Sequence, residues 1–270
     1  MTVENRFGMQ SKSVLITGAS QGLGLEVAQD LAREGMQVLI ADIQKEKGEE
    51  AVERIREDGG KAEFFFVDLS SPDSVSAMVD QVEKKCPKLD LLINNARFKP
   101  SSNPEDMSLE DWDLSMKITL SSAFYCARKV IPIMEKARKG CIINISSVAT
   151  IRISNLSLGY HTAKAGVSHL TRHLAYWAGP KGIRVNCISP GFLIKKENIP
   201  RYESDKAWKK RWEWCHPLKR AGYSEDLSSA ILFLASDMAG FITGQDLGLD
   251  GGYPLSDPGS LLTRYSEEFL

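Results

Sequence analysis

The amino-acid sequence predicts an α/β fold, a doubly wound parallel sheet with helices on both faces. The first observation is a series of short, almost wholly apolar runs, which is typical of parallel strands covered on both faces. The second is that segments with apolar residues at helical spacing alternate with these runs. The 270 residues contain no internal repeat and no low-complexity linker, so we expect a single domain, residues 1–270.

The elements follow in order from the first apolar run. Apolar runs predict strands over residues 13–16, 37–41, 64–67, 89–93 and 141–146. Helical spacing predicts helices over residues 22–33, 45–57, 74–85, about 109–135 and 157–178. The apolar content of the last two helices fits burial, either against the core or against a second subunit.

Composition and charge limit the possible partners. The formal net charge is -1, so no overall field favours nucleic acid or an anionic membrane. No apolar run approaches the roughly 18 residues that span a bilayer, and residues 1–10 are polar, unlike a signal peptide. The cysteines are scattered and form no C-x-x-C pair, which argues against a disulfide framework and a zinc site. We therefore expect a cytoplasmic protein that binds no metal, no nucleic acid and no membrane.

A glycine-rich turn, Thr17-Gly18-Ala19-Ser20-Gln21-Gly22-Leu23-Gly24, joins the first predicted strand to the first predicted helix. Glycine allows a tight turn and lets a pyrophosphate approach the backbone N–H groups at a helix N-terminus. The spacing is G-x-x-x-G-x-G, and such a cluster by itself can be only a turn. Its place between a strand and a helix favours dinucleotide binding.

Asp42 stands at the end of the second predicted strand, eighteen residues beyond Gly24. A carboxylate at this place accepts hydrogen bonds from the adenosine ribose hydroxyls and repels a 2′-phosphate. Neither Gln21 nor Ile43 adds a positive charge there. The sequence therefore favours NAD(H) over NADP(H), the alternative being a surface aspartate that only ends a strand.

Tyr160 and Lys164 are four residues apart on a predicted helix, and Ser147 follows the predicted strand at residues 141–146. Residues four apart share one helix face, which puts the lysine ammonium beside the phenol. An ammonium favours the phenolate and lowers the tyrosine pKa from about 10 towards the range useful for exchanging a proton with an alcohol. The Ser147 hydroxyl could hold the substrate oxygen opposite the phenol. A tyrosine and a lysine at this spacing also fit a solvated helix face.

Together these motifs resemble the short-chain dehydrogenase/reductase family over about residues 11–252. The resemblance rests on motifs in the family's order and spacing: Thr17-Gly18-x-x-x-Gly22-x-Gly24, Asp68, Asn94-Asn95-Ala96, Ser147, Tyr160-x-x-x-Lys164, Asn186-x-x-x-Pro190-Gly191 and Asp250-Gly251-Gly252. It implies one Rossmann-like domain with a seven-stranded parallel sheet, and hydride transfer between a nicotinamide and a secondary alcohol or carbonyl. The residues that it implies for NAD(H) binding are Gly18, Ser20, Gln21, Gly22, Leu23, Gly24, Asp42, Ile43, Asp68, Leu69, Asn94, Ala96, Tyr160, Lys164, Pro190, Gly191 and Leu193. The catalytic residues that it implies are Ser147, Tyr160 and Lys164, the last of which also binds the nicotinamide ribose.

The sequence departs from the family's pattern at three positions. Thr119 stands where the family usually has an asparagine associated with a water chain to the active-site lysine, and Thr119 could still take part in that proton relay. Arg97 replaces a glycine, and Lys195 replaces a threonine that commonly contacts the nicotinamide carboxamide. Both substitutions fit drift on loop surfaces, or else positive charge at the mouth of the site for an acidic or phosphorylated substrate.

Residues 192–218 correspond to the family's mobile lid over the substrate. Trp208 and Trp212 are one turn apart there, and they either line the substrate pocket or cover the core. The two long predicted helices are similar to those through which family members pair, so we expect a homodimer or homotetramer. Residues 253–270 extend past the family's usual end, and they either wrap a neighbouring subunit or are disordered.

The resulting prediction is an NAD(H)-dependent oxidoreductase that acts on a small-molecule alcohol or carbonyl. The three departures leave one alternative of another class, a catalytically silent NAD(H)-binding sensor or assembly subunit. The intact Ser147, Tyr160 and Lys164 argue against that alternative, because no structural need fixes all three.

Overall fold

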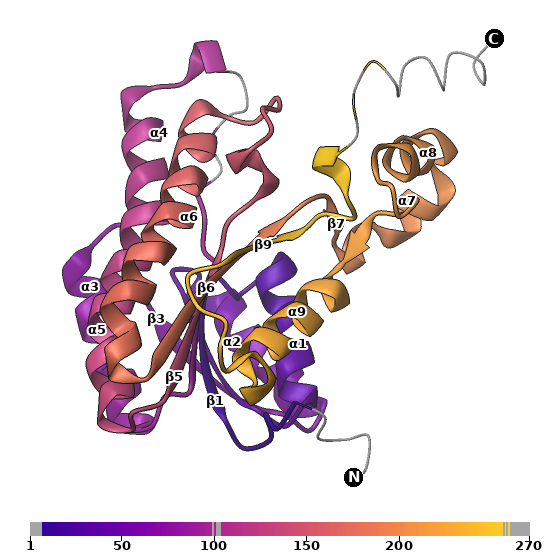
Figure 1. Cartoon of the computed structure of the whole chain (residues 1–270). Coiled ribbons are helices and arrows are strands. Elements are labelled where there is room, and N and C mark those ends of the chain that lie inside the picture. Colours follow the sequence, from indigo (N-terminus) through magenta and orange to yellow (C-terminus); the bar gives the residue numbers. More distant parts are fainter. Residues whose placement is uncertain (1–6, 99, 101–103, 256, 258, 260–270) are drawn as a thin grey trace.

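The computed structural model describes residues 7–98, 100, 104–255, 257 and 259, and it confirms the predicted fold class (Figure 1). Its centre is a seven-stranded sheet in the order β3-β2-β1-β4-β5-β6-β9, in which every neighbouring pair is parallel. The strands are β1 (Ser13–Thr17), β2 (Gln37–Asp42), β3 (Lys61–Phe66), β4 (Leu91–Asn94), β5 (Gly140–Ile145), β6 (Ile183–Pro190) and β9 (Asp246–Leu249). The strand order reverses between β1 and β4, and ligands of open α/β sheets bind at the carboxyl ends of strands at such a switch point.

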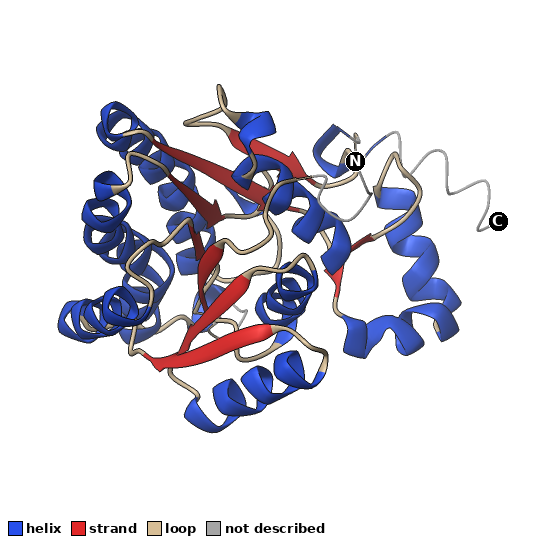
Figure 2. Cartoon of the chain, turned by 90° about the horizontal axis from the view of Figure 1, so that it is seen from below, coloured by secondary structure: helices blue, strands red, loops and turns tan. Residues whose placement is uncertain are grey.

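Helices cover both faces of the sheet (Figure 2). One face carries α1 (Gly22–Arg33), α2 (Lys45–Glu57) and α9 (Ser224–Ala235), and the other carries α3 (Pro72–Lys85), α5 (Ser122–Lys136) and α6 (Leu158–Ala178). The predicted lid begins around the short strand β7 (Leu193–Ile194), which pairs with β8 (Gly222–Tyr223) in a separate two-stranded sheet. Between them it forms α7 (Ile199–Ser204) and α8 (Lys206–Cys215), which stand beside the main layers in Figure 1.

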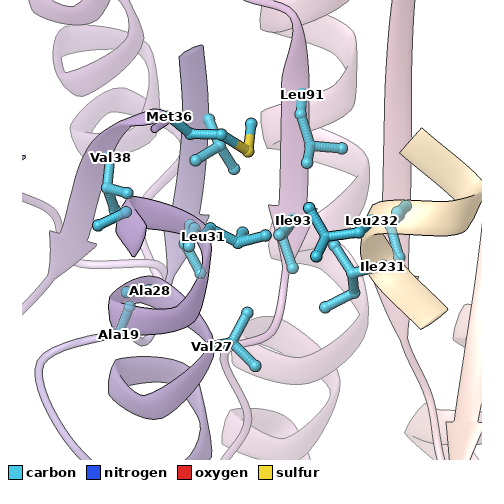
Figure 3. Close-up of a cluster of buried hydrophobic side chains, with 14 of the residues drawn as sticks. Ala19, Val27, Ala28, Leu31, Met36, Val38, Leu91, Ile93, Ile231 and Leu232 are labelled. Carbon is cyan, nitrogen blue, oxygen red and sulfur yellow. The ribbon is translucent and has the colours of Figure 1, made fainter. Parts of the chain in front are cut away.

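Alternating side chains along the strands divide the apolar core in two. Val14 and Ile16 of β1 are fully buried in a cluster with residues of α1 and α9, whereas Leu15 between them packs in a cluster with residues of α3 and α5. Figure 3 shows the first cluster, in which Leu31 of α1 and Ile231 of α9 lie over the sheet. Because both faces of β1 are buried, the strand is apolar almost throughout, which is why its sequence was readable as a parallel strand.

Two strands begin two or three residues away from their predicted starts, and the other ends agree to within one residue. β3 begins at Lys61, before the predicted apolar run, because it is an edge strand and the Lys61 side chain stays in water there. β4 begins at Leu91, and Leu89, although buried, lies outside the β1–β4 ladder. Each difference arises because apolar character follows burial, whereas strand bounds follow backbone pairing.

The first long predicted helix is interrupted, and the second is not. Residues 109–136 form α4 (Leu109–Leu114), a π-helical segment (Ser115–Ser121) and α5. The helix predicted over 157–178 is α6, and the Ser157 side chain caps it by accepting the N–H of Tyr160 at 3.2 Å. This cap sets the start of α6, whose first turn carries Tyr160.

None of the helices in the described residues is long and apolar enough to cross a membrane. At the C-terminal end the structure describes Tyr253–Leu255, a single 3-10 turn, together with Asp257 and Gly259. The rest of the predicted tail at 253–270 lies outside the described residues, so its role stays a prediction.

Candidate active site

A cleft of about 820 Å³ opens at the carboxyl ends of the parallel strands. Its wall is built by residues at or just after the strand ends: Gly18 after β1, Asp42 of β2, Ala96 after β4, Ser147 after β5 and Gly191 after β6. The volume lies within the range of small-molecule sites, about 300–1,000 Å³. The cleft therefore lies at the place that the fold reserves for a ligand.

The glycine turn packs tightly against the loop after β4. Gly18 and Gly22 have φ angles of +67° and +59°, a region that glycine adopts without strain. A methyl group on Gly24 would overlap the Gly18 carbonyl oxygen, and one on Gly18 would lie 2.8 Å from the Ala96 Cα. Gly22, Leu23 and Gly24 thus form the cleft wall at the start of α1, where the first N–H groups of a helix have no intrahelical acceptor. This cradle fits the diphosphate of a dinucleotide.

The two neighbouring asparagines at the end of β4, Asn94 within the strand and Asn95 just after it, have different surroundings. Asn94, which was predicted to lie along the cofactor, is buried, and its Nδ2 donates to Asn144 Oδ1 at 2.8 Å. Asn95 lines the cleft instead, and its Nδ2 donates to the carbonyl oxygens of Thr17 (3.1 Å) and Gly18 (2.9 Å). Asn95 therefore holds the glycine turn in place, and Asn94 joins β4 to β5. Consecutive residues point to opposite faces, so the motif alone did not decide between them.

Asp42 and its neighbours form the other end of the cleft. Asp42 Oδ2 accepts the N–H (3.1 Å) and the hydroxyl (2.6 Å) of Ser20, and Oδ1 accepts the N–H of Gln44 at 3.1 Å. Ser20, a predicted cofactor ligand, is itself buried, so its hydroxyl orients the Asp42 carboxylate. Asp68 and Leu69 line this end as well.

A cation that the sequence did not reveal also lies at this end. The Nζ of Lys47, on α2, donates to Gln44 Oε1 at 2.7 Å and to Gln21 Oε1 at 3.0 Å. Since α2 turns back over the end of β2, a lysine inside that helix reaches the same corner as Asp42. Only the packing of α2 places this charge here.

Ser147, Tyr160 and Lys164 lie together in the cleft. The Ser147 hydroxyl accepts the N–H of Ala149 at 3.1 Å and caps a 3-10 turn, Val148–Thr150. The Lys164 Nζ lies 5.8 Å from the centre of the Tyr160 ring, one helical turn away. The Ser146 hydroxyl donates to the Lys164 carbonyl oxygen at 2.8 Å and fastens α6 to the end of β5. The structure thus brings all three residues to one cleft, and their catalytic roles stay a prediction.

Lys164 is almost fully buried, and its Nζ donates to the Ile145 carbonyl oxygen at 2.6 Å. Burial, and next the Arg97 guanidinium, lower the pKa of Lys164 from 10.5 to about 7. The Arg97 Cζ lies 5.7 Å from the centre of the Tyr160 ring, so two cationic groups border the phenol.

Thr119 lies in the π-helical segment and is buried. Its hydroxyl accepts the N–H of Phe98 at 3.0 Å and so connects this segment to the loop that carries Arg97. Thr119 is not among the described residues that line the cleft. Its part in a proton relay stays a prediction.

The two lid tryptophans have different roles in packing. Trp212 lines the cleft and stacks on Phe192, with ring centroids 3.7 Å apart and planes 4° apart. Trp208 instead meets the rings of Phe192 (6.0 Å) and the buried Tyr202 (5.6 Å) at steep angles, within the apolar cluster of the lid. The sequence left open whether the two tryptophans line the pocket or cover the core. Trp212 lines the pocket, whereas Trp208 packs in the apolar core of the lid.

Three cationic side chains line the cleft. The Arg97 guanidinium lies beside the Tyr160 ring, whereas the Lys195 ammonium lies near Gly22. Arg152, which was not singled out in the sequence, also lines the cleft and donates to the Pro254 carbonyl oxygen. The acidic residues among the described lining residues, Asp42 and Asp68, lie at the carboxyl ends of β2 and β3. Within the described part of the chain, no three or more His, Cys, Asp or Glu residues gather in a way that could hold a metal ion.

Comparison with known proteins agrees with this geometry. A family model described as enoyl-(acyl carrier protein) reductase matches residues 18–254. The chain is 37% identical over 243 residues to 3-oxoacyl-(acyl-carrier-protein) reductase FabG of Chlamydia trachomatis, covering 90% of this chain and 97% of that protein. It is 36% identical over 250 residues to cyclopentanol dehydrogenase of Comamonas testosteroni, covering 91% and 98%.

Among solved structures, the chain is similar to 7α-hydroxysteroid dehydrogenase complexed with NADH and 7-oxo glycochenodeoxycholic acid. The TM-score is 0.82 at 32% identity, and the match covers 93% of this chain and 98% of that one. The chain therefore belongs to the short-chain dehydrogenase/reductase family, whose members are oxidoreductases that use a nicotinamide cofactor.

Proposed function

We propose that this oxidoreductase interconverts a secondary alcohol and a ketone with NAD(H). The observation that carries the proposal is a single cleft with Ser147, Tyr160 and Lys164 at one end and Asp42 at the other. One extended dinucleotide can reach both ends, which brings its reactive ring to the proton-transfer groups. Cyclopentanol, which names one relative, is a secondary alcohol, and NADH is bound in the complex of the structural relative.

The side chains at the catalytic end suit proton transfer to and from an oxygen. In the oxidative direction, the Tyr160 phenolate accepts the hydroxyl proton of the alcohol, and Ser147 donates a hydrogen bond to the oxygen that becomes the carbonyl. Lys164, when protonated, stabilises the phenolate, and it would also bind the nicotinamide ribose. The bound nicotinamide supplies the acceptor for the hydride. In the reductive direction, Tyr160 as a phenol returns the proton.

Asp42 supports the preference for NAD(H). Its carboxylate is held by Ser20 and Gln44 at the cleft wall, where it can accept the ribose hydroxyls and would repel a 2′-phosphate. Lys47 is the opposing observation, because its ammonium is held at the same corner and could pair with a 2′-phosphate. We expect the carboxylate to dominate, since it lines the cleft and Lys47 is exposed behind Gln21 and Gln44.

We propose that the substrate carries an anionic group. The Arg97 guanidinium lies 5.7 Å from the centre of the Tyr160 ring, and Arg152 lines the same cleft. A guanidinium binds a carboxylate or phosphate through two parallel hydrogen bonds, so this end favours an anion over a neutral alcohol.

We further propose a cytoplasmic homodimer or homotetramer. Near the end of α6, Tyr176 and Trp177 are 88% and 43% exposed, and on α5 Phe124 is 37% exposed, more apolar surface than a solvated face needs. Light scattering of the purified protein tests this, and a monomer at micromolar concentration would contradict it.

The experiment that tests the activity is a titration of the purified protein with NADH and NADPH, followed by tryptophan fluorescence. It is repeated over a panel of carbonyl compounds and alcohols while the absorbance of reduced nicotinamide is recorded. We expect tight NADH binding, weaker NADPH binding and turnover of at least one panel member.

Tyr160→Phe is the matched variant, because it removes only the phenolic hydroxyl. We expect turnover to be lost while the dissociation constant of NADH changes little. Unaltered turnover in this variant would refute the assigned chemistry. Tight NADH binding without turnover of any compound by the unaltered protein would favour the silent sensor, and Thr119→Asn would then be the next variant.

A further inference from the structure

The position of Lys195 differs from that expected of a substrate-binding residue. A methyl group placed on Gly22 would lie 3.4 Å from both the Nζ and the Cε of Lys195. The ammonium therefore lies over the glycine turn, at the beginning of α1, rather than beside the catalytic tyrosine. We propose that Lys195 binds the diphosphate of the dinucleotide and closes the glycine turn over it, an inference that rests on the proposed use of this cleft by NAD(H).

The chain fixes Lys195 in this place through helix α1 itself. The backbone N–H of the next residue, Lys196, donates to Glu26 Oε1 at 2.9 Å, and Glu26 is buried on α1 one turn after Gly22. The Lys196 Nζ pairs with Asp30 of α1 at 3.7 Å and with Glu225 of α9 at 3.3 Å. The segment that leads into the lid is thus held by the same helix whose N-terminus forms the diphosphate cradle.

In the protein without cofactor, the Lys195 ammonium contributes little to stability at this place. The N-terminus of a helix carries a partial positive charge, and α1 has no acidic residue in its first turn and no side-chain cap from Gln21. A lysine over such an end meets a like charge. Its ion pair with Glu197, at 3.3 Å, joins side chains that are 40% and 64% exposed, and such pairs contribute little to stability. An anion between the helix end and the ammonium would satisfy both.

A diphosphate supplies that anion in the bound state. It would accept hydrogen bonds from the helix N–H groups on one side and from the Lys195 ammonium on the other. Since β7 ends at the residue before Lys195 and the lid helices follow it, the contact would also couple cofactor binding to the position of the lid. Arg97 and Arg152 then remain as the cations for the substrate.

Binding of cofactor fragments tests the proposal without any turnover. The dissociation constants of NADH, ADP-ribose and adenosine are measured by calorimetry for the unaltered protein, Lys195→Gln, Lys195→Arg and Lys206→Gln. Lys206 is an exposed lysine of α8 and controls for the loss of one positive charge. We expect Lys195→Gln to weaken ADP-ribose and NADH about tenfold, in keeping with the loss of one charge-assisted hydrogen bond, and to leave adenosine unchanged. Lys195→Arg retains most of the affinity, and Lys206→Gln retains all of it.

A melting curve separates binding from a structural role. With the like charge removed, Lys195→Gln has a melting temperature equal to or above that of the unaltered free protein, while the upward shift caused by ADP-ribose becomes smaller. A lower melting temperature together with equally weakened adenosine binding would show a structural role and overturn the proposal. Unchanged ADP-ribose affinity would also overturn it, and a raised KM for the substrate in that case would return Lys195 to the substrate side. Because ADP-ribose carries no nicotinamide, failure of the proposed redox activity leaves this test intact.

Discussion

Replacing Lys164 with methionine should stabilise the free protein while abolishing turnover. Methionine fills a similar volume without a charge. In the folded protein the pKa of Lys164 is about 7, against 10.5 for the ordinary group, mainly because of burial. Each pH unit between the two values corresponds to about 1.4 kcal/mol, so at pH 7 the buried lysine lowers the free energy of unfolding by about 4 kcal/mol.

Part of this gain in stability is lost because the variant also loses the hydrogen bond that Lys164 donates. Lys164 Nζ donates to the buried Ile145 carbonyl oxygen at 2.6 Å, and methionine leaves that oxygen without this donor. An unsatisfied buried acceptor costs about 1–3 kcal/mol. We therefore expect Lys164→Met to be more stable than the unaltered protein by about 1–3 kcal/mol at pH 7, the difference between these two contributions.

The pH dependence of this difference is the stricter test. Folded Lys164 releases its proton near pH 7, whereas the unfolded chain keeps it until about 10.5, so between these values the unfolded state binds more protons. The unaltered protein therefore becomes more stable relative to Lys164→Met as the pH rises, by about 1.4 kcal/mol per unit. The advantage of the variant should disappear near pH 9.

Urea unfolding followed by circular dichroism at pH 7, 8 and 9, at one protein concentration, measures these free energies. Lys206→Met, at an exposed position, is the control and should show no pH-dependent difference from the unaltered protein. A difference between Lys164→Met and the unaltered protein that stays constant from pH 7 to 9 would refute the reasoning, because Lys164 would then keep an ordinary pKa when folded.

Three further predictions concern the ends of the cleft. Asp42→Ala removes the carboxylate that disfavours a 2′-phosphate, so the ratio of NADPH to NADH dissociation constants should fall about tenfold or more in fluorescence titrations; an unchanged ratio would deny Asp42 its role. Arg97→Ala should raise the KM of the best anionic substrate about tenfold while the affinity for NADH stays within twofold, and an unchanged KM would contradict the anionic-substrate proposal. Gly24→Ala puts a methyl group against the Gly18 carbonyl oxygen and Asn95 Nδ2, so the free energy of unfolding should fall by about 1–3 kcal/mol and ADP-ribose should bind more weakly; equal stability in urea would show that the turn can relax.

Much of the fold could be read because its signals are local. The apolar run of β1 reflects burial on both faces, and the helical spacing of α1 and α6 reflects one packed stripe on each. The predicted start of the edge strand β3 lies three residues after the observed one. The Lys61 side chain remains in water, so backbone hydrogen bonding rather than burial fixes the start of the strand. The π-helical turn around Thr119 left no local signal, since the residues of an α-helix and a π-helix are of the same kinds.

The sequence by itself determined the local geometry that depends on short spacings. Tyr160 and Lys164 share a face because one helical turn separates them, and Gly18 and Gly22 have positive φ angles, which glycine adopts without strain. The positions of Ser147 and Asp42 at the sheet edge could be predicted because each lies at or just after the end of an apolar strand.

Only the tertiary structure decided which residues from distant segments meet. Asn95, rather than Asn94, donates a hydrogen bond to the glycine turn, because the pairing of β4 turns the Asn94 side chain away from it. Trp212, rather than Trp208, lines the cleft because of the way the lid packs. The tertiary structure also buried Lys164 beside Ile145 and set Lys195 over Gly22. The physical reason is the same in each case: burial and electrostatic fields sum over neighbours in space, and a linear pattern records only neighbours along the chain.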